Sequence, residues 1–178
     1  MKVIFDWDGT LYEFVKDAKP EKWSAPGYAR GLSELSNVTK AVRKMADKKS
    51  FDGEDIELYI CTAVVSMDFA VKDKMFVAKR DKLGIPERNM VFVPYGNSKV
   101  DALKKAGVDI EPGDLFLDDY TNNLKELNNI PGLTPVKLLN GINDTHRSWK
   151  GARVSAFSTP SEIVDTLLGL SAIAKIAA

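Results

Sequence analysis

Five short apolar runs recur along the chain, and segments with helical spacing separate them. The runs occupy residues 3–5, 58–61, 90–93, 115–117 and 136–139. Near-continuous apolar strands of this length are typical of a parallel sheet that is covered on both faces. With 178 residues, 44% of them hydrophobic, the chain can bury one core but is too short for two independent ones. The sequence therefore predicts a single α/β domain over residues 1–178, doubly wound and Rossmann-like, with a mostly parallel sheet of about five strands.

The segments between these runs predict helices for both faces of the sheet. We expect helices at about 37–49, 68–83, 100–106 and 120–129, and a last helix that begins at residue 160. Thr159 and Glu162 form a capping-box pattern around Pro160, which predicts that start. Residues 13–36 fit no core element, so we interpret them as a short cap insertion over the end of the first strand, where loops usually shape a substrate pocket.

Acidic side chains follow two of the predicted strands at the point where each strand ends. Asp6 and Asp8 follow the first run, and Asp118 and Asp119 follow the fourth. Residues i and i+2 of a strand point to one side, and parallel strands end at one edge of the sheet, so we expect the four carboxylates within a few ångströms of each other. An Asp followed by Gly is also ordinary turn chemistry. Carboxylates at this density are nevertheless the hard oxygen ligands that Mg²⁺ prefers.

A hydroxyl and an ammonium group accompany this acidic edge. Thr62 follows the second predicted strand, and Lys99 stands at the start of a predicted helix. Beside a metal ion, these groups would form a cradle for an anion with several oxygens, such as phosphate.

Four stretches resemble the motifs of the haloacid dehalogenase superfamily of phosphohydrolases. They are FDWDGTL, LYICTA with Thr62, SKVDAL with Lys99, and LFLDD. The resemblance implies that Asp6 is the nucleophile and forms an aspartyl-phosphate, while Asp8 protonates the leaving oxygen and later activates water. Covalent catalysis of this kind divides a difficult displacement into two easier steps.

The same resemblance implies a Mg²⁺ cofactor and a phosphate site. Mg²⁺ would bind the Asp6 carboxylate, the backbone carbonyl of Asp8 and one acid of the pair at 118–119. We expect Asp119 as the direct ligand and Asp118 behind it, although the two could be exchanged. Thr62, the backbone N–H of Ala63 and Lys99 would hold the phosphate oxygens.

Further stretches resemble the bacterial and bacteriophage 5′(3′)-deoxyribonucleotidases, the pyrimidine 5′-nucleotidase type C family. They are PGYARGL, VPYGNSKVDAL, DDYTNNLKEL and KLLNGINDTHRSWKG. This resemblance implies a phosphoric monoester hydrolase that acts on nucleoside monophosphates. Two alternatives are a phosphatase for nucleic acid 3′ ends or other small phosphate esters, and a non-catalytic phosphate-binding protein. Trp23, Tyr28 and Trp149 are candidate nucleobase contacts by stacking, or else lids and partial core.

Composition limits the partners that we expect. Twenty-five basic residues balance twenty-five acidic ones, so nucleic acid and anionic membranes are not favoured as partners. The chain has no apolar run long enough to span a bilayer, and its lone Cys61 excludes an intramolecular disulfide. We expect a cytoplasmic protein and leave its oligomeric state open. A charged run is interpreted as a solvated helix face and comprises Lys72, Lys74, Lys79, Arg80 and Lys82.

Overall fold

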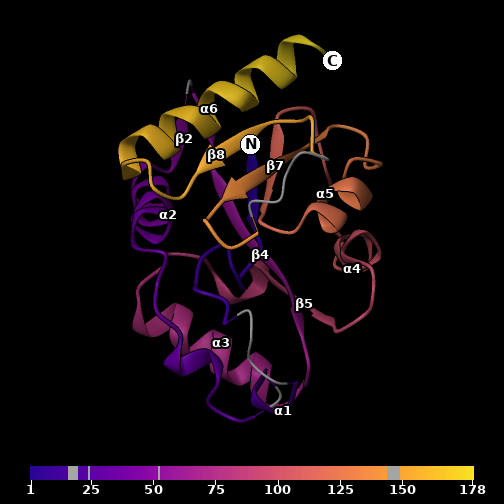
Figure 1. Cartoon of the computed structure of the whole chain (residues 1–178). Helices are drawn as coiled ribbons and strands as arrows, with labels where there is room; N and C mark the ends of the chain where they lie inside the picture. Colours follow the sequence, from indigo (N-terminus) through magenta and orange to yellow (C-terminus); the bar gives the residue numbers. More distant parts are fainter. Residues whose placement is uncertain (16–19, 24, 52, 144–148) are drawn as a thin grey trace.

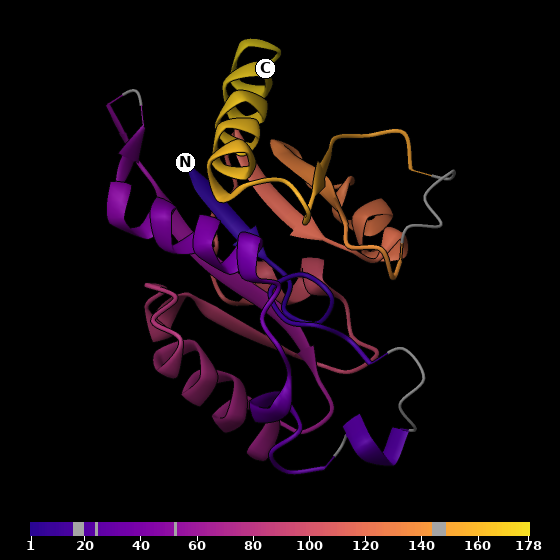
Figure 2. The same cartoon turned by 60° about the vertical axis from the view of Figure 1, so that its left-hand side comes forward.

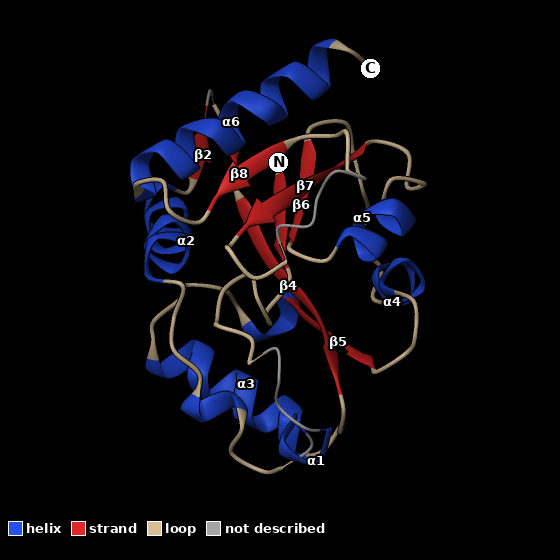
Figure 3. Ribbon diagram, in the orientation of Figure 1, coloured by secondary structure: helices blue, strands red, loops and turns tan. Residues whose placement is uncertain are grey.

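A six-stranded parallel sheet forms the centre of the computed structural model (Figures 1 and 3), which describes residues 1–15, 20–23, 25–51, 53–143 and 149–178. The strand order is β5-β4-β1-β6-β7-β8, and every neighbouring pair is parallel. The strands are β1 (Lys2–Phe5), β4 (Glu57–Val64), β5 (Met90–Pro94), β6 (Asp114–Asp118), β7 (Leu133–Leu139) and β8 (Arg153–Ser155). The five predicted strands and the α/β class are confirmed.

Three short strands were not predicted. β8 holds a single buried apolar residue, Val154, so it produces no apolar run in the sequence. β2 (Ser50–Phe51) and β3 (Glu54–Asp55) form a separate antiparallel pair of two residues each. Strands of this length carry no periodicity that a sequence pattern could reveal.

Helices cover both faces of the sheet, as predicted (Figures 1 and 2). The helices are α1 (Pro20–Trp23), α2 (Ser36–Lys48), α3 (Phe69–Arg80), α4 (Lys99–Lys105), α5 (Thr121–Leu127) and α6 (Pro160–Ile176), with 3-10 turns at Ala29–Gly31 and Glu87–Asn89. The capping box at Thr159 and Glu162 is present at the start of α6. Among the described residues, no helix combines the length and the apolar character needed to cross a membrane.

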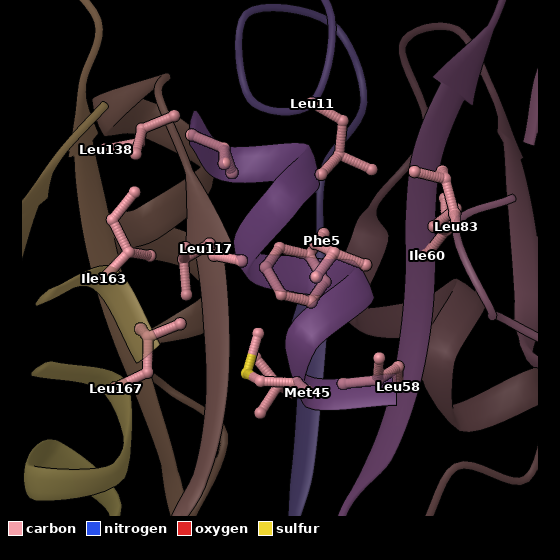
Figure 4. Packing of buried hydrophobic residues seen from close by; sticks show 14 of the residues in the cluster. Phe5, Leu11, Met45, Leu58, Ile60, Leu83, Leu117, Leu138, Ile163 and Leu167 are labelled. Atoms are coloured by element: carbon pink, nitrogen blue, oxygen red, sulfur yellow. The ribbon is translucent and has the colours of Figure 1, made fainter. Parts of the chain in front are cut away.

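The core lies in two layers, one on each face of the sheet. Successive side chains of β1 alternate between them, since Val3 and Phe5 join the larger cluster and Ile4 joins the smaller one. Figure 4 shows the larger cluster, in which Phe5 lies between the strand residues Leu117 and Ile60, with Met45 of α2 next to it. Burying β1 on both faces fixes the central strand, and therefore fixes the position of the residues that follow it.

The segment predicted as an insertion, residues 13–36, is tied to other parts of the described chain. It contains α1 and the turn at Ala29–Gly31, and a bridge between Tyr12 and Glu34 closes its base. Asp73 of α3 anchors it further, because its carboxylate accepts the Gly27 N–H at 2.5 Å and the Arg30 Nε–H at 2.6 Å. The insertion is therefore attached to α3.

Candidate active site

Asp6 lies immediately beyond β1, and its carboxylate faces a buried lysine. The Asp6 N–H donates to the Leu117 carbonyl at 2.9 Å, which keeps the residue alongside β6. Lys99, the first residue of α4, places its Nζ 2.8 Å from Asp6 Oδ1 and 2.7 Å from Asp118 Oδ2. Burial opposes the charge on Lys99, but the two carboxylates prevail and raise its pKa. The ammonium group is therefore a fixed positive charge between two acids.

Three buried carboxylates converge at this edge of the sheet. Asp6, Asp118 and Asp119 each offer one oxygen, and these oxygens lie within 4.8 Å of one another. Burial raises the pKa of Asp119 to about 7, and the nearby Asp118 and Asp6 add to that effect. When all three are ionised, Lys99 offsets one charge and two negative charges remain. This oxygen-only, doubly negative donor set fits Mg²⁺.

The carboxylate of Asp118 is fully engaged by donors from the protein. Its Oδ1 accepts the Tyr120 N–H at 2.7 Å, and its Oδ2 accepts Lys99 Nζ at 2.7 Å and Asn123 Nδ2 at 2.9 Å. A carboxylate with both oxygens bonded in this way has little capacity left for a metal ion. The protein itself therefore holds Asp118 through both of its oxygens.

Two amide groups donate to one oxygen of the Asp119 carboxylate. Asn140 Nδ2 donates to Oδ2 at 3.0 Å and Asn143 Nδ2 donates to the same oxygen at 2.5 Å. Within the described part of the chain, no hydrogen-bond donor reaches Oδ1 of Asp119. The buried Lys137 of β7 donates to the Asp119 backbone carbonyl. Asp119 therefore differs from Asp118, whose two oxygens both accept hydrogen bonds.

Asp8 does not join the three carboxylates, so the prediction of four acids in one group is wrong. The expectation relied on strand geometry, but β1 ends at Phe5 and the chain turns at residues 7–10. The alternation that would place Asp6 and Asp8 on one side therefore no longer applies. Instead, Asp8 Oδ2 lies 2.7 Å from Nζ of Lys74.

Lys74 is a site residue that the sequence interpretation missed. It was assigned to a solvated face, yet it is only 4% exposed. Its Nζ lies 2.8 Å from Thr62 Oγ1 and 3.2 Å from the Ala63 carbonyl, in addition to the ion pair with Asp8. The other four residues of the run are exposed, as predicted: Lys72, Lys79, Arg80 and Lys82.

Helical periodicity contains a signal that could have identified Lys74. The inward face of α3 includes Val77 and Ala78, and Lys74 precedes them by one turn on the same face. A lysine on the buried side of a helix needs an acidic or polar partner, since it is almost never buried unpaired. The run was interpreted from its charge alone, so the buried position of Lys74 was not recognised.

The three candidate aromatic residues differ in their surroundings. Trp149 is 6% exposed and its indole N–H donates to the Ala152 carbonyl at 2.9 Å, so its ring is part of the core. Trp23 and Tyr28 are half-buried in the insertion, where Trp23 packs against Phe14 with ring centroids 5.4 Å apart. These two retain surface that a ligand could contact.

Two further reactive side chains of the sequence are Cys61 and His146. Cys61 is buried within β4, and burial raises the pKa of its thiol to about 12, so it is an inert core residue as expected. His146, which the sequence placed in a polar loop, lies outside the described residues.

Comparison with known proteins identifies the fold. No protein-family model matches the sequence, and no curated protein is similar to it. The structure is similar to a solved HAD-superfamily hydrolase from Ehrlichia chaffeensis, with a TM-score of 0.57 over 94% of this chain and 96% of that chain. The two sequences are 12% identical, so the likeness concerns the fold. The protein therefore has the fold of a haloacid dehalogenase superfamily hydrolase, with a buried acidic cluster beyond its central strand.

Proposed function

We propose that the protein is a Mg²⁺-dependent phosphomonoesterase that hydrolyses nucleoside monophosphates through an aspartyl-phosphate on Asp6. The observation that carries this proposal is the environment of Asp6. Its carboxylate is held by Lys99 beside Asp118 and Asp119, at the carboxyl end of the central strand. Open α/β sheets bind their ligands at this edge.

In the first step, an Asp6 oxygen attacks the phosphorus of the monoester. A bond forms between that oxygen and phosphorus, and the bond from phosphorus to the ester oxygen breaks. Asp8 donates a proton to the departing oxygen, which leaves as an alcohol. Lys99 keeps Asp6 oriented and offsets the negative charge of the incoming phosphoryl group.

In the second step, water replaces Asp6 on phosphorus. Asp8, now ionised, accepts a proton from the water as its oxygen bonds to phosphorus, and the bond to Asp6 breaks. The products are inorganic phosphate and free Asp6, so protons and bonds balance over the cycle. One carboxyl group therefore serves as acid and then as base.

Lys74 and Thr62 supply the second half of the phosphate site. Lys74 Nζ lies 2.8 Å from Thr62 Oγ1 and 3.2 Å from the Ala63 carbonyl oxygen. An ammonium group and a hydroxyl are donors suited to phosphate oxygens. When bound, Mg²⁺ held by Asp6, Asp119 and the Asp8 backbone carbonyl would further neutralise charge on the phosphoryl group.

The nucleotide assignment rests on the resemblance of several stretches to deoxyribonucleotidases. One of these, PGYARGL, falls in the insertion that Asp73 anchors beside the site. The insertion offers Trp23 and Tyr28, which are both partly exposed residues. Aromatic faces of this kind stack on any nucleobase, so they support a nucleotide without selecting the base.

Release of inorganic phosphate tests the proposal directly. A panel of nucleoside monophosphates, with dTMP first, is compared with a 3′-phosphorylated oligonucleotide and simple sugar phosphates, with Mg²⁺ or with EDTA. We expect Mg²⁺-dependent turnover that is fastest on the mononucleotides. Asp6→Asn keeps the side-chain shape and should lower kcat by on the order of 10³-fold or more. Turnover on no phosphate ester, or equal turnover in Asp6→Asn, would overturn the proposal.

A further inference from the structure

A turn at residues 140–143 packs against the candidate metal ligand Asp119. Asn140 Oδ1 accepts the N–H of Ile142 at 2.8 Å and the N–H of Asn143 at 3.0 Å. Because these backbone donors require an acceptor, the amide of Asn140 can have only one orientation. Its Nδ2 therefore faces the site, where it donates to Gly9 O at 2.7 Å and to Asp119 Oδ2 at 3.0 Å.

Oδ2 of Asp119 is enclosed on several sides. Asn143 Nδ2 is its second amide donor, at 2.5 Å. Gly9 lies against the same carboxylate, since a Cβ atom built on it would lie 2.2 Å from Oδ2 and 2.9 Å from Oδ1. The Asp119 carboxylate is thus held in place, and both amide donors bind it through Oδ2.

We propose that Asn140 and Asn143 are positioning residues that make Asp119 a one-oxygen ligand, and that they thereby favour Mg²⁺ over Ca²⁺. This inference rests on the metal site of the proposed function. Mg²⁺ requires near-octahedral geometry with short, single-oxygen contacts, whereas Ca²⁺ takes six to eight oxygens and readily binds a carboxylate through both. Two amide donors on Oδ2 oppose the two-oxygen mode and leave the one-oxygen mode unaffected.

Substitutions at Asn143 separate this role from a general effect on folding. Asn143 is partly exposed, whereas Asn140 is buried and also holds the turn and the Gly9 carbonyl. Asn143→Ala removes one donor from Oδ2, and Asn143→Asp replaces that donor with a further carboxylate. Asn122→Ala removes an exposed asparagine of α5 and is the matched control. Circular dichroism and Tm establish that each variant is folded.

Calorimetric titration with MgCl₂ alone and with CaCl₂ alone gives the measurement, and it does not depend on turnover. Loss of a residue that orients a metal ligand typically lowers affinity by about 10- to 100-fold. For Asn143→Ala we expect such a loss for Mg²⁺ and a smaller loss for Ca²⁺, so the ratio of the two Kd values shifts toward Ca²⁺. Asn143→Asp should shift that ratio further, and Asn122→Ala should leave it unchanged.

The outcomes distinguish this inference from the proposed function. If the wild-type protein binds Mg²⁺ and both Asn143 variants lose affinity for the two ions equally, the inference is overturned and the metal site stands. If the wild-type protein binds neither ion, the metal site of the proposed function is wrong and the inference falls with it. A change in the Kd ratio that is confined to the Asn143 variants supports the inference.

Discussion

Lys74 Nζ lies 2.7 Å from Asp8 Oδ2, and this contact joins α3 to the loop that follows β1. The lysine side chain is 5% exposed and that of the aspartate is 30% exposed. Under the proposed mechanism, Asp8 transfers the proton and Lys74 donates to a phosphate oxygen. The ion pair therefore links the proposed phosphate donor to the proposed acid.

Lys74→Met tests this link. The substitution keeps the length of the side chain but removes the charge that contacts Asp8 and Thr62. We expect a higher KM, since a phosphate ligand is lost, and a kcat lower by about 10- to 100-fold, within the range that acid catalysis contributes. Steady-state kinetics on the preferred substrate of the panel measure both constants.

Lys72→Met is the matched control on the same helix. Lys72 is exposed and pairs with Asp68, one turn before it. Its substitution should leave KM and kcat near wild-type values. If Lys74→Met behaves like Lys72→Met, then Lys74 has no part in the reaction.

The sequence could predict those features that follow from local burial patterns and from parallel strand ends. Apolar runs and capping signals predicted five strands of the sheet and the start of α6, because burial on both faces dictates those patterns locally. Asp6, Lys99 and the pair at 118–119 were also placed together correctly, since parallel strands end at one edge.

What could not be predicted depends on local turns and on contacts between distant segments. The position of Asp8 is set by the turn after Phe5, and no alternation pattern describes a turn. Asn140 contacts Gly9, which lies 131 positions away in the sequence, and Asp119, which lies 21 positions away. An Asn-Gly pair is common in turns, so its sequence signal is the same with or without such contacts.

Stability should depend on pH and Mg²⁺ together, because of Asp119. Its pKa is raised from 3.8 to about 7, so the folded protein holds this proton more tightly than the unfolded chain does. The contribution of Asp119 to the free energy of unfolding therefore decreases as pH rises from about 4 to about 7. A metal ion requires the ionised carboxylate, so the increase in Tm caused by Mg²⁺ should grow between pH 6 and pH 8. Thermal melts with and without MgCl₂ at each pH measure this increase in Tm.

Asp119→Asn supplies the comparison for this pH dependence. The amide does not titrate, so the variant should lose this part of the pH dependence and most of the increase in Tm with Mg²⁺. An increase in Tm that stays constant across this pH range in the wild-type protein would contradict the role of Asp119.

Gly9→Ala should damage the site as well as the fold. Gly9 has a φ of +75°, which costs a residue with a Cβ about 1–2 kcal/mol. In addition, the new Cβ would lie 2.2 Å from Asp119 Oδ2, so the carboxylate must move. Gly53→Ala has a similar φ of +81° and no atom within 4 Å, so it reports the backbone cost alone. We expect Gly9→Ala to lose more stability in urea than Gly53→Ala, and Mg²⁺ affinity to fall only in Gly9→Ala.

Asp73→Ala should loosen the insertion over the site. Asp73 is 5% exposed, and its carboxylate accepts both the Gly27 N–H and the Arg30 Nε–H. Arg30 also lies over the Phe76 ring, 4.6 Å from its centroid. Removing the acceptor leaves two donors without their partner, which typically costs about 1–3 kcal/mol. We expect a lower Tm, faster cleavage by trypsin within residues 20–31 and a higher KM, whereas kcat should change little because Asp6 and Lys99 are untouched.

Asp68→Ala removes an exposed ion pair from the same helix and should change none of these quantities. Equal cleavage rates in the two variants would show that Asp73 does not hold the insertion in place.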